Sequence, residues 1–274
     1  MLIKKSILFV LVSIVALNAA ALKPLPMVTL EHPPFNYRDQ KTGEIVGSTV
    51  HILREVLERI GYEPVITMMP WKRAQHETTK GKFAGLFTLT KSPNRLEIYH
   101  YVDTPVLTSV DVFFKMKSNN LTWNKFSDLQ GLRLGLNDGY NYPDAYKNNQ
   151  HVFENVFITG PKPELQALQM LMRGRIDLYM CSINICTTVI RFNQDKLHGI
   201  DYMNKPIQGF VNAYIAFSKK WPGGLELRDK FEKEYKKYIE EGGRDRAHKL
   251  YHVVSQWGDS FDGGSASDTK YMDR

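Results

Sequence analysis

The chain has 274 residues and a formal net charge of +7, from 36 lysines and arginines against 29 aspartates and glutamates. Its 43% hydrophobic and 24% charged residues are ordinary for a globular protein, which excludes collagen-like, coiled-coil and disordered chains. Acidic and basic residues are mixed throughout, which disfavours nucleic-acid binding, and two cysteines are too few for a disulfide scaffold or a four-cysteine zinc module. The length allows one large domain or two of ordinary size.

The N-terminus has the three parts of a secretory signal peptide. Lys4 and Lys5 precede an apolar run over residues 7–17, and a small-residue cleavage site follows at residues 19–21. The run is shorter than the roughly 20 residues that a membrane span needs. We therefore expect residues 1–21 to be a cleaved signal peptide and the mature protein to be periplasmic. The alternatives are a buried N-terminal helix or an uncleaved anchor.

Beyond the signal, strand-like and helix-like segments alternate along the chain. The strand-like segments are residues 27–30, 65–69, 83–89, 110–115, 132–136, 176–181 and 213–217. The helix-like segments are residues 49–60, 71–80 and 164–172, followed by two late helices whose apolar faces carry Leu227, Phe231, Tyr235 and Tyr238, and then Ala247, Leu250, Val254 and Trp257. This alternation predicts an α/β fold with largely parallel sheets, and residues 258–274 are expected to fray.

The common catalytic and metal-binding motifs are missing from the sequence. There is no glycine-rich phosphate loop, no G-x-S-x-G and no H-E-x-x-H. His248 and His252 have ligand-like spacing but lack a third ligand, so we expect them on a helix surface and expect no metal and no cofactor. Cys181 and Cys186 are five residues apart, which leaves both a disulfide and two buried thiols open.

Several segments, taken in order, resemble the family 3 periplasmic solute-binding proteins, the polar-amino-acid class that serves ABC transporters. The segments are Pro33-Pro34-Phe35-Asn36-Tyr37 with Gly43 and Gly47, then Ser92-Pro93-Asn94-Arg95 with Tyr101 and Pro105, then Asp128-Leu129-Gln130-Gly131, and finally Gly174-Arg175-Ile176-Asp177. Trp71-Lys72-Arg73-Ala74 after Pro70 also resembles a subgroup that carries "PWKRA".

The resemblance implies a type II periplasmic binding protein fold, an α/β architecture of two lobes joined by two hinge strands. Residues 22–114 and 211–274 would form lobe 1, and residues 115–210 would form lobe 2. A ligand would bind between the lobes and be enclosed when they close.

In such a family the arginine that matches Arg95 binds the ligand's α-carboxylate, and a guanidinium offers the planar pair of donors that a carboxylate needs. Thr90 and Ser92 precede it and would add hydroxyl and amide donors, although both could instead serve a simple turn. Trp71 would form an aromatic wall over the ligand or belong to the core.

Two further parts of the cleft are expected to contribute. Glu31, with His32 at the end of the first strand, could accept a hydrogen bond from a ligand ammonium group or could be solvated. Gly139, Tyr140 and Asn141 would open a helix of the second lobe, whose N-terminal amides favour anions.

The sequence also departs from the family pattern. The aspartate that usually binds the ligand's α-amino group falls at about Ser182, Ala84 replaces another usual aspartate, and His51 stands where an acid is common. The resemblance therefore implies an intact carboxylate site and an altered ammonium site. Either Glu31 supplies the missing charge, or the ligand is not a standard α-amino acid.

We expect a monomeric, non-catalytic binding protein that captures a small carboxylate-bearing ligand, an amino acid or a relative, for ABC import. One alternative is an enzyme on the same fold, similar to cyclohexadienyl dehydratase, for which Glu31 and His32 are the candidate acid and base. Another is a ligand-sensing partner of a membrane receptor rather than of a permease. No nucleic-acid partner is expected.

Overall fold

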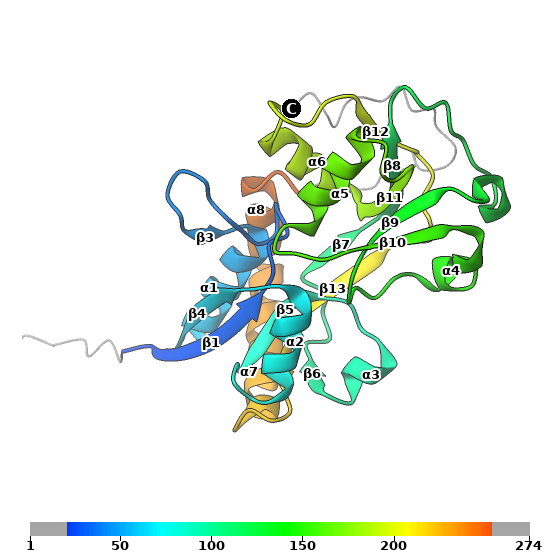
Figure 1. Ribbon diagram of the computed structural model, residues 1–274. Coiled ribbons are helices and arrows are strands. Elements are labelled where there is room, and N and C mark those ends of the chain that lie inside the picture. The colour runs from blue at the N-terminus through cyan, green and yellow to red at the C-terminus, as the bar shows by residue number, and fades with distance from the viewer. Residues whose placement is uncertain (1–20, 254–274) are drawn as a thin grey trace, which may run out of the picture.

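The structure, a computed structural model, describes residues 21–253. The expected signal peptide lies outside these residues except for Ala21, and the expected frayed tail lies wholly outside them. Two mixed sheets, each covered by helices, form two lobes (Figure 1). The prediction of a two-lobed α/β fold is confirmed. Within residues 21–253 no helix is long and apolar enough to cross a membrane.

The first lobe is built on a sheet in the order β4-β1-β5-β13-β6. Its strands are β1 (Lys23–Thr29), β4 (Tyr62–Met68), β5 (Gly85–Leu89), β6 (Tyr99–Tyr101) and β13 (Val211–Ser218). The strands β4, β1 and β5 are parallel, whereas β13 runs antiparallel to β5 and β6. The helices of this lobe are α1 (Ser48–Arg59), α2 (Trp71–Thr79), α3 (Pro93–Leu96), α7 (Gly224–Glu240) and α8 (Gly243–Leu250), and a small hairpin joins β2 (Tyr37–Arg38) to β3 (Ile45–Val46).

The second lobe has a sheet in the order β10-β9-β11-β8-β12. Its strands are β8 (Asp111–Met116), β9 (Arg133–Asn137), β10 (Glu154–Ile158), β11 (Leu178–Ser182) and β12 (Ile200–Tyr202). The strands β10, β9 and β11 are parallel, and β8 is antiparallel to β11 and β12. The helices are α4 (Asp144–Lys147), α5 (Pro163–Met172) and α6 (Ile183–Phe192), with short 3₁₀ turns η1 (Phe126–Leu129) and η2 (Gln150–Val152).

Two extended segments connect the lobes. The outgoing strand β7 (Leu107–Ser109) pairs with β13, and the chain then enters the second sheet at Asp111. It returns to the first sheet at Val211, the first residue of β13. The expected lobe boundary after residue 114 therefore falls inside β8, which belongs to the second sheet from its first residue.

The apolar faces that the sequence predicts for α1 and α7 are buried. Val50, Leu53, Val56 and Leu57 of α1 share one hydrophobic core with Leu227, Phe231, Tyr235 and Tyr238 of α7. This shared core exists because the C-terminal helices return to the first lobe, where they cover its sheet.

Two expectations for the last helix are wrong. Leu250 ends α8 and is 60% exposed, whereas His248 is buried and its Nε2 lies 3.1 Å from the Val106 carbonyl oxygen. Burial lowers the pKa of His248 to about 4, so the side chain is neutral at physiological pH. In α8 the side chains of Ala247 and His248 are buried, and Val254 and Trp257 of the expected apolar face lie outside the described residues.

Cys181 and Cys186 form a disulfide, with their Cα atoms 6.3 Å apart. The bond ties the end of β11 to the first turns of α6, directly beside Ser182. The sequence left open a disulfide or two buried thiols, and the structure contains the disulfide.

Replacing both cysteines with alanine is expected to lower the free energy of unfolding by about 2 kcal/mol, because the bond closes a short loop in the unfolded chain. Urea unfolding of the oxidised wild type and of the double variant would measure the difference. Dithiothreitol should destabilise the wild type to a similar extent and leave the double variant unchanged. Equal transition midpoints for the oxidised wild type and the double variant would contradict the prediction.

Candidate functional site

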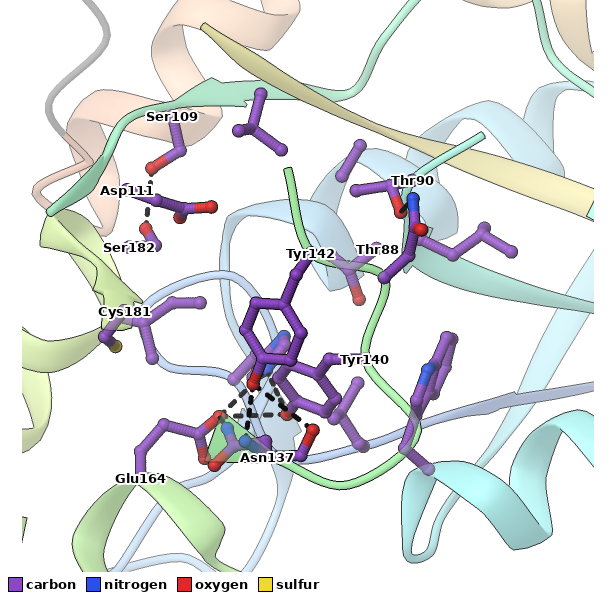
Figure 2. A pocket seen from close by; sticks show the side chains of 18 of the residues that line it. Thr88, Thr90, Ser109, Asp111, Asn137, Tyr140, Tyr142, Glu164, Cys181 and Ser182 are labelled. Atoms are coloured by element: carbon purple, nitrogen blue, oxygen red, sulfur yellow. Dashed lines mark hydrogen bonds and ion pairs between the residues drawn. The ribbon is translucent and has the colours of Figure 1, made fainter. Parts of the chain in front are cut away.

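A cavity of about 120 Å³ lies between the two lobes (Figure 2). It is lined at the carboxyl ends of strands from both sheets, as is usual for binding crevices of open α/β sheets. The polar residues around it are His32, Thr88, Thr90, Arg95, Ser109, Asp111, Asn137, Tyr140, Asn141, Tyr142, Glu164, Tyr179 and Ser182. The apolar residues include Leu30, Phe35, Trp71 and Ile185. The cavity is therefore polar on several sides, with apolar walls between the polar groups.

Arg95 is the cationic group in this cavity that the first lobe supplies. It lies in α3, which Pro93 begins, and the residue is only 9% exposed. Its Nη1 donates to the carbonyl oxygen and to the hydroxyl of Thr90, at 3.1 and 3.0 Å, and its Nε donates to Gln75 Oε1 at 3.2 Å. Within residues 21–253 no carboxylate pairs with this guanidinium, and burial lowers the pKa of Arg95. Its Nη2 donors thus remain for a ligand.

Trp71 packs beside this guanidinium. The Arg95 Cζ lies 5.7 Å from the centre of the indole ring, within the range of a cation–π contact. Trp71 is the first residue of α2 and is 7% exposed, and it also contacts the apolar core of the first lobe. The indole therefore serves both the core and one wall of the cavity.

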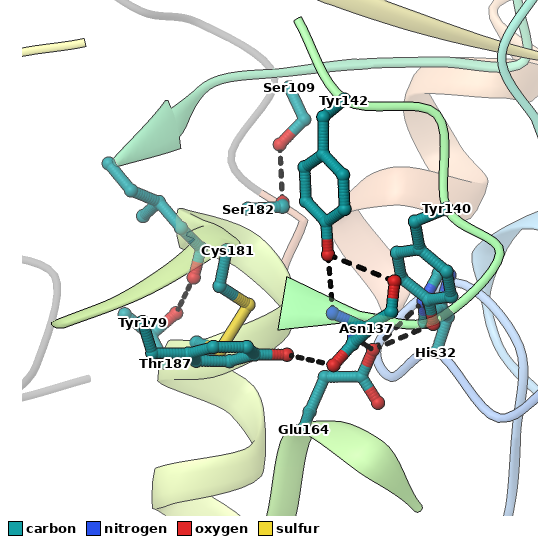
Figure 3. Close-up of a disulfide and its surroundings, with 12 residues drawn as sticks. His32, Ser109, Asn137, Tyr140, Tyr142, Glu164, Tyr179, Cys181, Ser182 and Thr187 are labelled. Atoms are coloured by element: carbon teal, nitrogen blue, oxygen red, sulfur yellow. Dashed lines mark hydrogen bonds and ion pairs between the residues drawn. A yellow bond between two sulfur atoms is a disulfide. The ribbon is translucent and has the colours of Figure 1, made fainter. Parts of the chain in front are cut away.

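Glu164 is the centre of a buried network that joins the lobes (Figure 3). It occupies the first turn of α5, where the helix dipole favours a carboxylate, and is 3% exposed. Its Oε1 accepts hydrogen bonds from Asn137 Nδ2 and from the Tyr140 hydroxyl, both at 2.9 Å. His32 Nε2, from the first lobe, lies 3.1 Å from the same oxygen and 2.7 Å from the Tyr140 hydroxyl. The carboxylate is thus well supplied with partners.

Other contacts also cross between the lobes. Lys72 Nζ of α2 lies 2.5 Å from Asp138 Oδ2, and Lys162 Nζ lies 3.2 Å from Glu31 Oε1. Asn141 Nδ2 donates to the Thr90 hydroxyl at 3.3 Å. The loop over residues 138–142 provides two of these contacts, through Asp138 and Asn141, so it lies against the first lobe at the cavity.

Asp111 is the second carboxylate of the cavity and its surroundings are different. It begins β8 and faces Ser182 of β11 in the antiparallel register. The hydroxyls of Ser182 and Ser109 bond to each other at 2.6 Å, and no described residue donates a hydrogen bond to the Asp111 side chain. Burial raises the pKa of Asp111 to about 6, and the nearby His32 opposes this rise only in part.

A family model described as bacterial extracellular solute-binding proteins, family 3, matches residues 26–253. The chain belongs to this family. No curated protein sequence matches the chain.

Solved structures of amino acid-binding proteins resemble the described fold. The substrate-binding protein of an amino acid ABC transporter is 18% identical, with a TM-score of 0.71, and the match covers 83% of this chain and 98% of that one. An L-arginine-bound binding protein from Streptococcus pneumoniae has the same identity and TM-score and is covered over 94%. An ancestral amino acid-binding protein, a precursor of cyclohexadienyl dehydratase, has 18% identity, a TM-score of 0.69 and coverage of 83% and 95%. At this identity the likeness establishes the fold.

The structure of this family 3 protein brings together five of the residues singled out from the sequence. Trp71, Thr90, Arg95, Tyr140 and Asn141 all line the cavity. All five lie on the cavity wall, and their contact with a ligand stays a prediction.

The remaining three lie elsewhere. Glu31 is not on the cavity wall, and its carboxylate pairs with Lys162. Ser92 lines a neighbouring cavity of about 310 Å³, which shares Thr90, Asp111 and Asn141 with the first. Gly139 has a φ of +81° and packs on Lys72, whose Cγ would lie 2.7 Å from an added Cβ.

The expected helix at Gly139 is absent, and that expectation is wrong. The helix α4 begins only at Asp144, after Pro143, and has four residues. Proline at 143 has ψ of 148°, which is extended, so residues 139–143 form a loop. Tyr140 and Asn141 reach the cavity by their side chains from this loop.

Sequence reasoning missed Asp111, Asn137 and Glu164. Two of them could have been found from the sequence. Asp111 is an acid in an otherwise apolar strand segment, and Glu164 follows Pro163 at the start of a helix. Asn137 ends β9, where carboxyl-terminal residues of parallel strands reach a crevice. In the part of the chain that the structure describes, no group of His, Cys, Asp and Glu side chains is arranged to hold a metal ion.

Proposed function

We propose that this family 3 protein captures a small polar ligand with a carboxylate group, an amino acid or a close relative, in the periplasm for an ABC importer. The observation that carries this proposal is Arg95, a buried guanidinium with free donors and no carboxylate partner among the described residues. A buried charge without a partner is unfavourable, and a ligand carboxylate would supply the partner. Structural neighbours described as amino acid ABC transporter binding proteins support the same ligand class.

Binding would proceed by closure of the two lobes about the β7 and β13 connections. Arg95 and Thr90 belong to the first lobe and would hold the carboxylate first. The loop with Tyr140 and Asn141 would then approach from the second lobe and exclude water, as the contact between Asn141 and Thr90 supports. The closed form would be the one that a permease recognises.

We infer that the protein acts by binding and not by catalysis. The candidate acid and base from the sequence are both engaged: Glu31 pairs with Lys162, and His32 contacts Tyr140 and Glu164. The enzyme alternative predicts that purified protein converts prephenate, and measurable turnover would overturn our inference. A permease gene beside the gene for this chain would favour import over receptor sensing.

A thermal-shift screen of the purified protein tests the proposed function. A ligand at about 100 times its Kd stabilises the folded chain by about 2.7 kcal/mol, which corresponds to a Tm increase of roughly 5–10 °C for a protein of this size. We expect such increases from amino acids or other small carboxylates. Increases produced by amines or polyamines without a carboxylate, with none from carboxylates, would contradict the role of Arg95.

A further inference from the structure

The two carboxylates of the cavity are not equivalent. Glu164 Oε1 accepts hydrogen bonds from Asn137 and Tyr140 and lies 3.1 Å from His32 Nε2, so this carboxylate already has partners within the protein. The Asp111 carboxylate has no hydrogen-bond donor and no ion-pair partner among residues 21–253. Of the two acids, Asp111 is thus the one whose carboxylate has no partner among the described residues.

The cavity also contains a cationic group, Arg95, without an ionic partner in the described part of the chain. Arg95 and Asp111 line one cavity from different lobes, and neither has an ionic partner within the described residues. Two such groups of opposite charge complement a molecule that carries one anionic and one cationic group. We propose that Asp111 accepts a hydrogen bond from the ammonium group of a zwitterionic ligand whose carboxylate Arg95 binds. This inference rests on the proposed function, because it takes the carboxylate site as given.

The strand pairing explains why the acid is available at this place. Asp111 and Ser182 are opposite each other on antiparallel strands, so their side chains leave the same face of the sheet. The hydroxyls of Ser182 and Ser109 bond to each other, and neither makes a hydrogen bond to the Asp111 carboxylate. Asp111 also lines the neighbouring cavity, so an ammonium group can approach it from the wider part of the cleft.

Glu31, the other acid near the cleft, is a weaker candidate. Its carboxylate already pairs with Lys162 at 3.2 Å and lies off the cavity wall. A ligand ammonium group would have to displace that lysine, whereas at Asp111 it would displace no protein group.

The electrostatic surroundings of Asp111 make the inference testable by pH. His32, Tyr142 and Tyr179 are the titratable groups that interact with its charge, and Arg95 and Glu164 line the same cavity. In the folded protein without bound ligand, half of the Asp111 side chains are protonated at about pH 6. An ammonium group binds the ionised form, so the affinity should fall by about tenfold from pH 7 to pH 5.

The experiment is isothermal titration of the wild type and of Asp111→Asn with the standard L-amino acids, followed by the N-acetyl derivative and the decarboxylated amine of the strongest binder. We expect Asp111→Asn to bind that amino acid about 10- to 100-fold more weakly and to lose most of the pH dependence. We expect the wild type to lose at least as much affinity for the N-acetyl derivative. Asp195→Asn, the same change at an exposed position of the second lobe, should bind as the wild type does.

A stability measurement separates this role from a structural one. Because the folded-state pKa of Asp111 is raised, protonation stabilises the fold below the unfolded pKa, and this contribution is lost as the pH rises through about 6. Asp111→Asn without ligand should therefore melt at a higher temperature than the wild type at pH 7, and the gain should vanish near pH 4. A lower Tm at pH 7 would identify a structural partner for Asp111 and overturn the inference.

The outcomes also separate the two proposals. If no amino acid or carboxylate binds the wild type, the proposed function fails and the inference fails with it. If an amino acid binds the wild type and Asp111→Asn equally well, or if its N-acetyl derivative binds as well as the parent, the inference fails and the proposed function stands.

Discussion

Arg95→Ala is expected to abolish ligand-induced stabilisation and to weaken binding at least about 100-fold. The guanidinium is held toward the cavity by Thr90 and Gln75, so its free donors are already oriented for a carboxylate. If Arg95 binds the ligand carboxylate as we propose, its removal deletes charge-assisted hydrogen bonds worth roughly 1.5–3 kcal/mol each. Titration calorimetry with the amino acid that stabilises the wild type most would measure the loss.

The control for this experiment is Arg73→Ala, which removes an exposed arginine from α2 in the same lobe. It should bind as the wild type does. Arg95→Lys keeps the charge but loses the planar pair of donors, so we expect an intermediate affinity. If Arg95→Ala retains wild-type affinity while circular dichroism shows a native fold, the carboxylate site lies elsewhere.

Gly47→Ala is expected to destabilise the protein by more than about 3 kcal/mol, because both the backbone angle and the space exclude a side chain. Gly47 has a φ of +128°, and an added Cβ would lie 2.3 Å from the Phe35 carbonyl oxygen. At this point the N-terminus of α1 packs on the Pro33–Phe35 turn, and the backbone amide of Thr49 donates to the same Phe35 oxygen. Equilibrium unfolding in urea would measure the change.

Gly43→Ala provides the matched comparison. Gly43 also has a positive φ, +74°, but an added Cβ there would meet nothing within 4 Å. We expect a loss of about 1 kcal/mol from the backbone angle alone. Similar losses at both positions would show that the close approach at Gly47 relaxes without cost, and our explanation of that glycine would be wrong.

Most of the fold could be predicted from the sequence, and the elements that could not be predicted have physical explanations. The 3.6-residue periodicity of α1 and α7 reflects one buried face each, which sequence alone reveals. Helix α6 was missed because it follows Ser182 without a turn and contains Ile183, Val189 and Ile190, which are poor helix formers. The packing of α6 in the core of the second lobe outweighs the low helix propensity of these residues.

A place on the cavity wall was predictable for residues that stand in a sequence motif, and not for residues that pairing between distant strands brings there. Arg95 and Trp71 stand in recognisable motifs. Asp111 faces Ser182 only because β8 runs antiparallel to β11, and sequence gives no measure of that register. The contact of His32 with Glu164 joins residues 132 positions apart and depends on how the lobes meet.

The central place of β13 in the first sheet has a consequence for the order of folding. Among the strands of residues 21–253, β6 pairs only with β13 in that sheet, and β5 has β13 as one of its two neighbours. The sheet therefore cannot be completed before residues 211–218 are present. The second lobe is one continuous segment and needs no later part of the chain for its sheet. Contacts between distant segments form slowly, so the second lobe should acquire protection from hydrogen exchange first and the first lobe should follow.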